Sequence, residues 1–182
     1  ALLPEITRVM NLVFTGPYPQ EWAVSALTAI PKPKGDLSNM DDYRGIAVGN
    51  ALAKLYSTLL MQRMDAWAES HKHRAKGQAG FRRDRSAADN IFVLQHSIER
   101  ARAHNQVVYC AFIDFQKAYD SVNRDLLWPA LHSLGVHGAF LRGLQHMYAN
   151  VEMRVKLEGR LGKAFAAPLG VKQGDPLSPL LF

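Results

Sequence analysis

Two aspartates, six residues apart, are the first side chains whose position suggests chemistry. Asp114 stands near the end of an almost wholly apolar run, residues 107–115, which predicts a buried central strand, and Asp120 follows it. A carboxylate that leaves a buried strand is costly unless it is paired, hydrogen-bonded or bound to a cation. Mg²⁺ takes oxygen ligands and keeps coordination sites open for phosphate oxygens. Asp114 is therefore either a metal ligand or a cap of the following turn, whereas Asp120 is expected to cap a helix or form a salt bridge.

Two turns carry the next candidates. In the polar turn 170–179, two glycines bracket Gln173, so the backbone can approach a ligand closely and the amide can donate or accept a hydrogen bond. A tight connection before a helix is the alternative. The lysines of the turn 32–35, backed by Arg44, could clamp a polyphosphate or belong to a solvated loop. The basic segment 72–85 could follow a nucleic-acid backbone or form a solvated face.

Composition limits the class of protein. The 182 residues are 48% hydrophobic and 21% charged, which excludes wholesale disorder. Cys110 is the single cysteine, so a disulfide scaffold and a cysteine-based zinc site are excluded. The formal net charge of +6 favours a polyanionic partner. No apolar run is long enough to span a membrane, and we expect an intracellular protein without a membrane partner. Both ends of the chain look cut, so we expect a piece of a longer protein.

The elements that must position these residues follow from periodicity and turn signals. A hairpin with a basic tip is expected from strands at 22–30 and 43–48, and a strand at 151–158 turns into 163–169. Helices are expected at 5–14, after Asn50, after Ser86, at 123–134 and at 138–149. Helices and strands are mixed, with hairpins outside βαβ pairs, which predicts the α+β class.

Four segments, taken in order, resemble a known family. They are Tyr43-Arg44-Gly45-Ile46, Gln78-Ala79-Gly80-Phe81-Arg82, Phe112 to Val122, and Gly170 to Phe182. They look like successive blocks of a reverse transcriptase, most of all the non-LTR (LINE-type) retrotransposon enzymes. The resemblance implies a right-hand fold of fingers, palm and thumb. Residues 1–105 would be fingers and finger–palm junction, residues 106–182 a partial palm, and the thumb absent.

The resemblance also implies roles for single residues. Asp114 falls on the first catalytic aspartate, which would ligate two Mg²⁺ ions (Mn²⁺ is possible), and the backbone carbonyl of Phe115 would add a ligand to one of them. Tyr119 falls on the steric gate that disfavours a 2′-OH. Arg44 and Lys32 fall on residues that hold the incoming triphosphate. The remaining matches are Gln173 and Gly174, against the nascent base pair, and Phe81 and Arg82, near the template strand.

The implied activity is template-directed nucleotidyl transfer on an RNA template, a DNA primer and dNTPs, at chromosomal DNA in the nucleus. Two Mg²⁺ ions about 3.5–4 Å apart would activate the 3′-oxygen and stabilise the leaving pyrophosphate. The family's next block, with paired aspartates, would lie beyond Phe182, so we expect these residues alone to be inactive and the parent protein to be active. The alternatives are a non-catalytic nucleic-acid-binding remnant of a retroelement and a group II intron-type maturase.

Overall fold

The computed structural model describes residues 2–182, which form two compact units. The first unit consists of the described residues up to Met64 together with Lys117–Phe182, and the second is Asp65–Gln116. Both contain helices, and the first also contains a four-stranded sheet. The structure therefore has the mixed α+β character that the sequence predicts.

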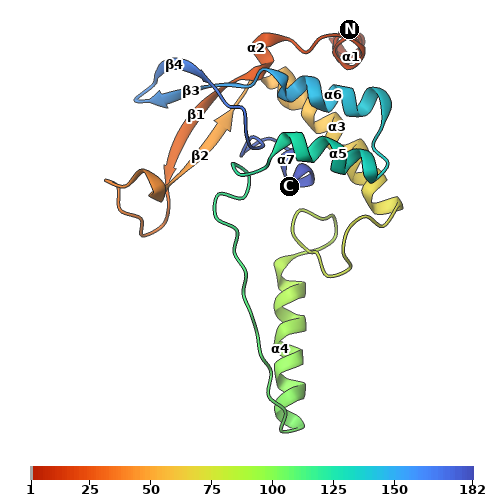
Figure 1. Cartoon of the computed structure of the whole chain (residues 1–182), viewed down its shortest axis with the longest axis vertical. Helices are drawn as coiled ribbons and strands as arrows, with labels where there is room; N and C mark the ends of the chain where they lie inside the picture. Colours follow the sequence, from red (N-terminus) through yellow and green to blue (C-terminus); the bar gives the residue numbers. More distant parts are fainter. Residues whose placement is uncertain (1) are drawn as a thin grey trace. The chain divides into compact units, whose positions relative to one another are not determined.

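The sheet of the first unit has the strand order β2-β1-β3-β4 (Figure 1). Strand β1 (Val24–Pro31) pairs antiparallel with β2 (Tyr43–Val48) and parallel with β3 (Glu152–Leu157), which pairs antiparallel with β4 (Arg160–Ala166). Both predicted hairpins are thus confirmed, and the parallel β1–β3 pairing joins them into one sheet.

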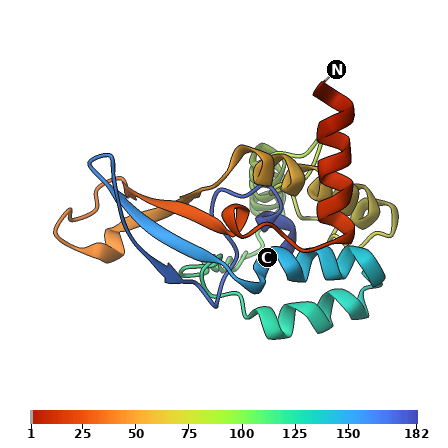
Figure 2. The same cartoon turned by 90° about the horizontal axis from the view of Figure 1, so that it is seen from above.

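Helices cover the rest of the first unit. They are α1 (Leu2–Thr15), α2 (Gln20–Ala23), α3 (Ala51–Ser70, which continues into the second unit), α5 (Arg124–Ser133), α6 (Gly138–Ala149) and α7 (Ser178–Leu181). Figure 2 shows α5 and α6 side by side, with α1 standing against α6. Leu60, Leu144 and Leu177 are fully buried in the core of this unit.

Several helix starts follow the local signals in the sequence. The Asn50 side chain accepts a hydrogen bond from the Leu52 N–H at 2.8 Å, and Asn123 accepts from the Asp125 N–H at 2.9 Å. Helix α4 (Ala87–Ala103), in the second unit, begins with a capping box between Ser86 and Asp89. Each of these side chains satisfies a backbone N–H that has no partner within the helix.

The apolar run 107–115 is not a strand, and the prediction of a buried central strand there is wrong. Residues 106–115 have no regular secondary structure, and Tyr109, Phe112 and Ile113 are 92%, 84% and 83% exposed. Cys110, which lies within the predicted buried strand, is exposed as well. A strand is stable only where a neighbour accepts its backbone hydrogen bonds. The second unit has no strand among residues 65–116, so the run has no partner within its own unit.

Candidate functional site

The basic hairpin of the first unit presents Lys32 and Arg44 on neighbouring strand ends. Arg44 lies opposite Ile30 in the β1–β2 register and is exposed. Lys32 follows β1, and its ammonium group donates a hydrogen bond of 2.7 Å to the carbonyl oxygen of Asp41. These two cations lie at the end of one hairpin, as a site for a polyphosphate requires.

A salt bridge joins this hairpin to a distant turn of the same unit. Lys117 Nζ lies 2.8 Å from the Asp41 Oδ1 atom, across 76 positions of sequence. Lys117 lowers the pKa of the Asp41 carboxyl, and Asp41 in turn raises the pKa of Lys117. Both side chains are mostly exposed, so this pair contributes little to stability. It places the turn that begins at Lys117 beside the hairpin tip.

Tyr119 lies in that turn, residues 117–122, which we call the Tyr119 turn. Backbone contacts hold it in place. The Val171 N–H donates to the Tyr119 carbonyl oxygen at 2.8 Å, and the Gly170 N–H donates to the Val122 carbonyl oxygen at 2.9 Å. The Tyr119 ring is half-buried, with its centroid 5.7 Å from that of Phe182, and burial raises the pKa of its hydroxyl. The segment that begins at Gly170 therefore fixes the position of Tyr119.

Gln173 and Gly174 are fixed in turn against strand β2. The Ala47 N–H donates to the Gln173 carbonyl oxygen at 2.8 Å. Gly174 has φ +111°, and a Cβ atom there would lie 3.0 Å from the Ala47 carbonyl oxygen. The Gln173 side chain is half-exposed. A Cβ atom would be crowded here, on a backbone conformation that residues with side chains rarely adopt, so glycine suits this close approach.

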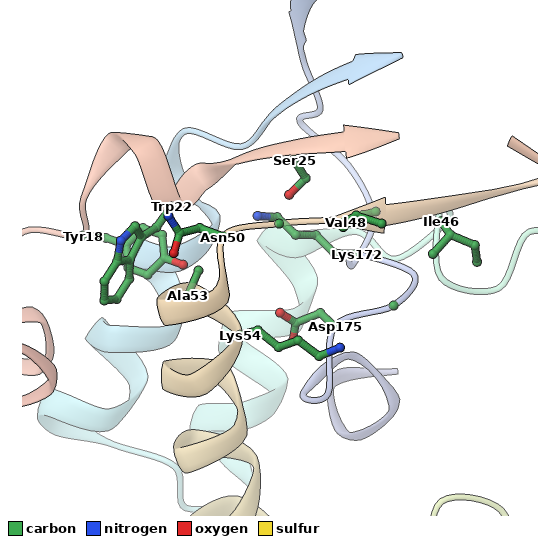
Figure 3. A pocket seen from close by; sticks show the side chains of 13 residues that line it. Tyr18, Trp22, Ser25, Ile46, Val48, Asn50, Ala53, Lys54, Lys172 and Asp175 are labelled. Atoms are coloured by element: carbon green, nitrogen blue, oxygen red, sulfur yellow. The ribbon is translucent and has the colours of Figure 1, made fainter. Parts of the chain in front are cut away.

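A pocket lies behind this turn, between the end of β2 and the start of α3 (Figure 3). Its wall includes Trp22, Asn50, Lys172 and Asp175. Lys172 donates a hydrogen bond of 3.2 Å to the Ala23 carbonyl oxygen, and burial lowers the pKa of its ammonium group. Asp175 accepts hydrogen bonds from the Leu177 N–H at 2.9 Å and from the Ser57 hydroxyl. These contacts anchor the turn from its rear side.

Arg124 is a residue of this site that the sequence analysis missed. Its guanidinium group is buried and donates to three backbone carbonyl oxygens, two of which belong to Leu169 and Gly170. One signal was present in the sequence: Arg124 shares a helical face with Leu127 and Leu131, and a charge on an apolar face indicates a specific partner.

Asp114 and Phe115 belong to the second unit, whereas Lys32, Arg44, Tyr119, Gln173 and Gly174 belong to the first. Asp114 and Phe115 are both exposed. The Asp114 carboxylate and the Phe115 carbonyl are the hard oxygen donors that suit Mg²⁺. Within residues 2–182, no group of three or more His, Cys, Asp and Glu side chains lies close enough together to hold a metal ion. Two oxygen donors would fill only part of a Mg²⁺ coordination shell.

Phe81 and Arg82 lie in the basic loop of the second unit, in different environments. The Phe81 side chain is 73% exposed on a residue with φ +52°. Arg82 instead forms a bidentate ion pair with Glu69: its Nε and Nη2 atoms donate to the two carboxylate oxygens at 2.7 and 2.8 Å. Arg82 and then Arg74 lower the pKa of Glu69 to about 2. Arg74 also pairs with Asp65, so an ion-pair network closes the loop.

Comparison of the sequence with known proteins shows the family to which the chain belongs. Residues 30–182 match the model of the family described as reverse transcriptase (RNA-dependent DNA polymerase), and the chain belongs to that family. The similar proteins are products of non-LTR retrotransposons, so the chain is a reverse transcriptase domain of the non-LTR type. Among the described residues, no helix is both long and apolar enough to cross a membrane.

Three relatives show how much of a longer protein the chain represents. The "Retrovirus-related Pol polyprotein from type-1 retrotransposable element R2" of Popillia japonica is 30% identical over 92% of this chain and 23% of its own length. The type-2 R2DM polyprotein of Drosophila melanogaster is 28% identical over 96% of the chain and 16% of its own length. The "Probable RNA-directed DNA polymerase from transposon BS", also from Drosophila melanogaster, is 28% identical over 91% and 18%. The chain thus spans less than a quarter of these proteins.

Proposed function

We propose that this chain is the nucleotide-binding part of an RNA-directed DNA polymerase that copies an RNA template from a DNA primer. The observation that carries the proposal is the set of backbone contacts in the first unit. They join the Tyr119 turn, the Gln173–Gly174 turn and strand β2, which bears Arg44, into one surface. By the resemblance, these residues fall on the family's nucleotide-binding motifs, and Arg44 and Gln173 are 129 positions apart in the sequence.

The roles of the basic residues follow from the chemistry of phosphoryl transfer, in which positioning and electrostatic stabilisation dominate. Arg44 presents a planar fork of donors that suits phosphate oxygens, and Lys32 adds a second positive charge at the same hairpin. On binding a dNTP, Lys32 would exchange the Asp41 carbonyl oxygen for the triphosphate.

Tyr119 and Gln173 would bind the other parts of the nucleotide. The Tyr119 ring would lie under the sugar and exclude a 2′-OH by contact. The Gln173–Gly174 turn would pack against the nascent base pair, where the backbone must approach closely.

Asp114 is the proposed metal-ligating carboxylate, and the Phe115 carbonyl is its neighbouring donor. When bound, two Mg²⁺ ions (or Mn²⁺) would activate the primer 3′-oxygen and stabilise the leaving pyrophosphate. Phe81 would contact the template, with Arg82 at its side. In this assignment residues 1–105 are fingers and finger–palm junction, residues 106–182 are partial palm, and the protein acts on nuclear chromosomal DNA.

The test is primer extension by the full-length parent protein with and without Asp114→Asn. We expect the variant to abolish extension while template affinity stays within about tenfold, or ~1.4 kcal/mol. Asp125→Asn, a similarly exposed carboxylate in the first turn of α5, is the matched control and should keep its activity. Near-normal turnover of Asp114→Asn would refute the metal assignment. A parent that binds template but never extends a primer would favour the non-catalytic remnant.

A further inference from the structure

Arg124 is a buried cation without a carboxylate partner. It is 7% exposed, and the ion pairs found among residues 2–182 do not include it. Removing a charge from water is costly unless hydrogen bonds compensate. A buried guanidinium group is therefore expected to have a specific geometric task.

The partners of Arg124 show what that task is. Its Nε atom donates to the Gly170 carbonyl oxygen at 2.7 Å and its Nη2 atom to the Leu169 carbonyl oxygen at 3.0 Å. The Nη1 atom donates to the Tyr148 carbonyl oxygen at 3.1 Å, and the guanidinium carbon lies 5.0 Å from the centroid of the Tyr148 ring. Tyr148 is in the last turn of α6, where carbonyl oxygens lack helical partners and the helix dipole favours a cation. Arg124 thus fastens the irregular segment 169–170 to the end of α6.

That segment links the two nucleotide-contact candidates, Tyr119 and Gln173. On one side, Gly170 and Val171 donate to the backbone of the Tyr119 turn, and a Cβ atom on Gly170 would lie 2.9 Å from the Tyr119 carbonyl oxygen. On the other side, Gln173 follows two residues after Val171 and is fixed to β2 through Ala47. A shift of segment 169–171 would therefore move Tyr119 relative to Gln173.

We propose that Arg124 is a positioning residue for nucleotide selection, which holds segment 169–171 so that Tyr119 and Gln173 keep one relative placement. Arg124 itself does not contact the nucleotide. This inference rests on the proposed function, because it concerns how that site distinguishes sugars. Lysine cannot replace arginine here, because one ammonium group cannot direct donors along the three directions that the planar guanidinium group covers.

The experiment compares Arg124→Lys with the unmodified full-length parent protein. We measure kcat/KM for a dNTP and for the matching rNTP, and the ratio of the two is the selectivity. Displacing a positioned group costs up to about 10²-fold, so we expect the selectivity to fall roughly tenfold or more. Arg142→Lys, an exposed arginine on α6, is the matched control and should leave the selectivity unchanged.

A second measurement shows whether the effect passes through Tyr119. In the double variant Arg124→Lys/Tyr119→Ala, we expect little further loss of selectivity beyond that of Tyr119→Ala, because residues that act through one another are not additive. Fully additive losses would overturn the proposal. So would a variant with lowered thermal stability and kcat but unchanged selectivity, since that result marks a purely structural residue.

Three further outcomes are decisive. If Arg124→Lys does not fold, Arg124→Gln replaces it, and failure of both variants to fold assigns Arg124 to folding and overturns the proposal. A parent without any primer extension refutes the proposed function, and the positioning role falls with it. An active parent whose Arg124 variants keep full selectivity refutes the positioning role alone.

Discussion

Gly170 offers a direct test of how tightly the Tyr119 turn is packed. Gly170 and Gly159 have the same backbone φ of +79°, but their surroundings differ. A Cβ atom on Gly170 would lie 2.9 Å from three backbone atoms of Tyr119 and Asp120, whereas nothing lies within 4 Å of one on Gly159. Alanine at either position therefore meets the same backbone strain, and only at Gly170 does it also meet a clash.

The magnitudes follow from these two contributions. Left-handed backbone costs alanine about 1–2 kcal/mol, and the loss of unfolded-state freedom offsets about 0.4–1 kcal/mol of that. Gly159→Ala should therefore lower the free energy of unfolding by about 0–1.6 kcal/mol. Gly170→Ala adds an overpacking cost of about 1–3 kcal/mol, because the atoms in the way are backbone and cannot rotate aside.

The assay is thermal unfolding of the two variants and the unmodified chain, followed by near-ultraviolet circular dichroism. The difference between the variants corresponds to roughly 2–12 °C in the midpoint, at about 2–4 °C per kcal/mol for a chain of this size. Equal midpoints for Gly159→Ala and Gly170→Ala would refute the close packing of segment 170–171 on the Tyr119 turn, and with it the route by which Arg124 is proposed to act.

Three other predictions concern single side chains. Arg44→Ala in the parent protein should raise the apparent KM for dNTP by about 10- to 100-fold, from the loss of charge-assisted hydrogen bonds of about 1.5–3 kcal/mol, and a change confined to template affinity would contradict the triphosphate role. Tyr119→Ala should lower discrimination against ribonucleotides about tenfold or more, or ~1.4 kcal/mol, and unchanged selectivity argues against the gate. Glu69 has a pKa of about 2 in the folded chain, below its ordinary value of 4.5, so the ion-paired loop should be fully stabilised above about pH 4.5 and should lose that stabilisation as the pH falls through about 2. Hydrogen exchange in residues 71–85 measures this loss of stabilisation, and the Glu69→Gln variant should show no such pH dependence.

Much of the fold is encoded in contacts between residues close in sequence. The caps at Asn50, Ser86 and Asn123 are local, since each side chain bonds a backbone N–H two or three residues away. The β1–β2 hairpin likewise follows from alternation and a turn. Such features are readable because their physical cause lies within a few residues of the signal.

The predictions that were wrong or incomplete concern residues whose structure depends on partners far away in the sequence. The apolar run 107–115 predicts a strand by composition, but a strand needs a neighbour, and the second unit has none among its described residues. Arg82 looks like one more basic residue of a solvated or nucleic-acid-binding loop, yet Glu69, thirteen positions away, takes its guanidinium group. No local pattern reports such a partner.

The sequence by itself determined the family, the helices and hairpins, and the identity of the candidate residues Asp114, Tyr119, Arg44 and Gln173, since motif order and short-range periodicity are written along the chain. Only the tertiary structure decided how Tyr119 and Gln173 are held: through Gly170, Val171 and the buried Arg124, whose carbonyl partners lie 24 to 46 residues away. The physical reason is that the hydrogen bonds of a buried guanidinium group are made to whatever backbone the fold brings beside it, and that backbone leaves no signal at the position of the arginine.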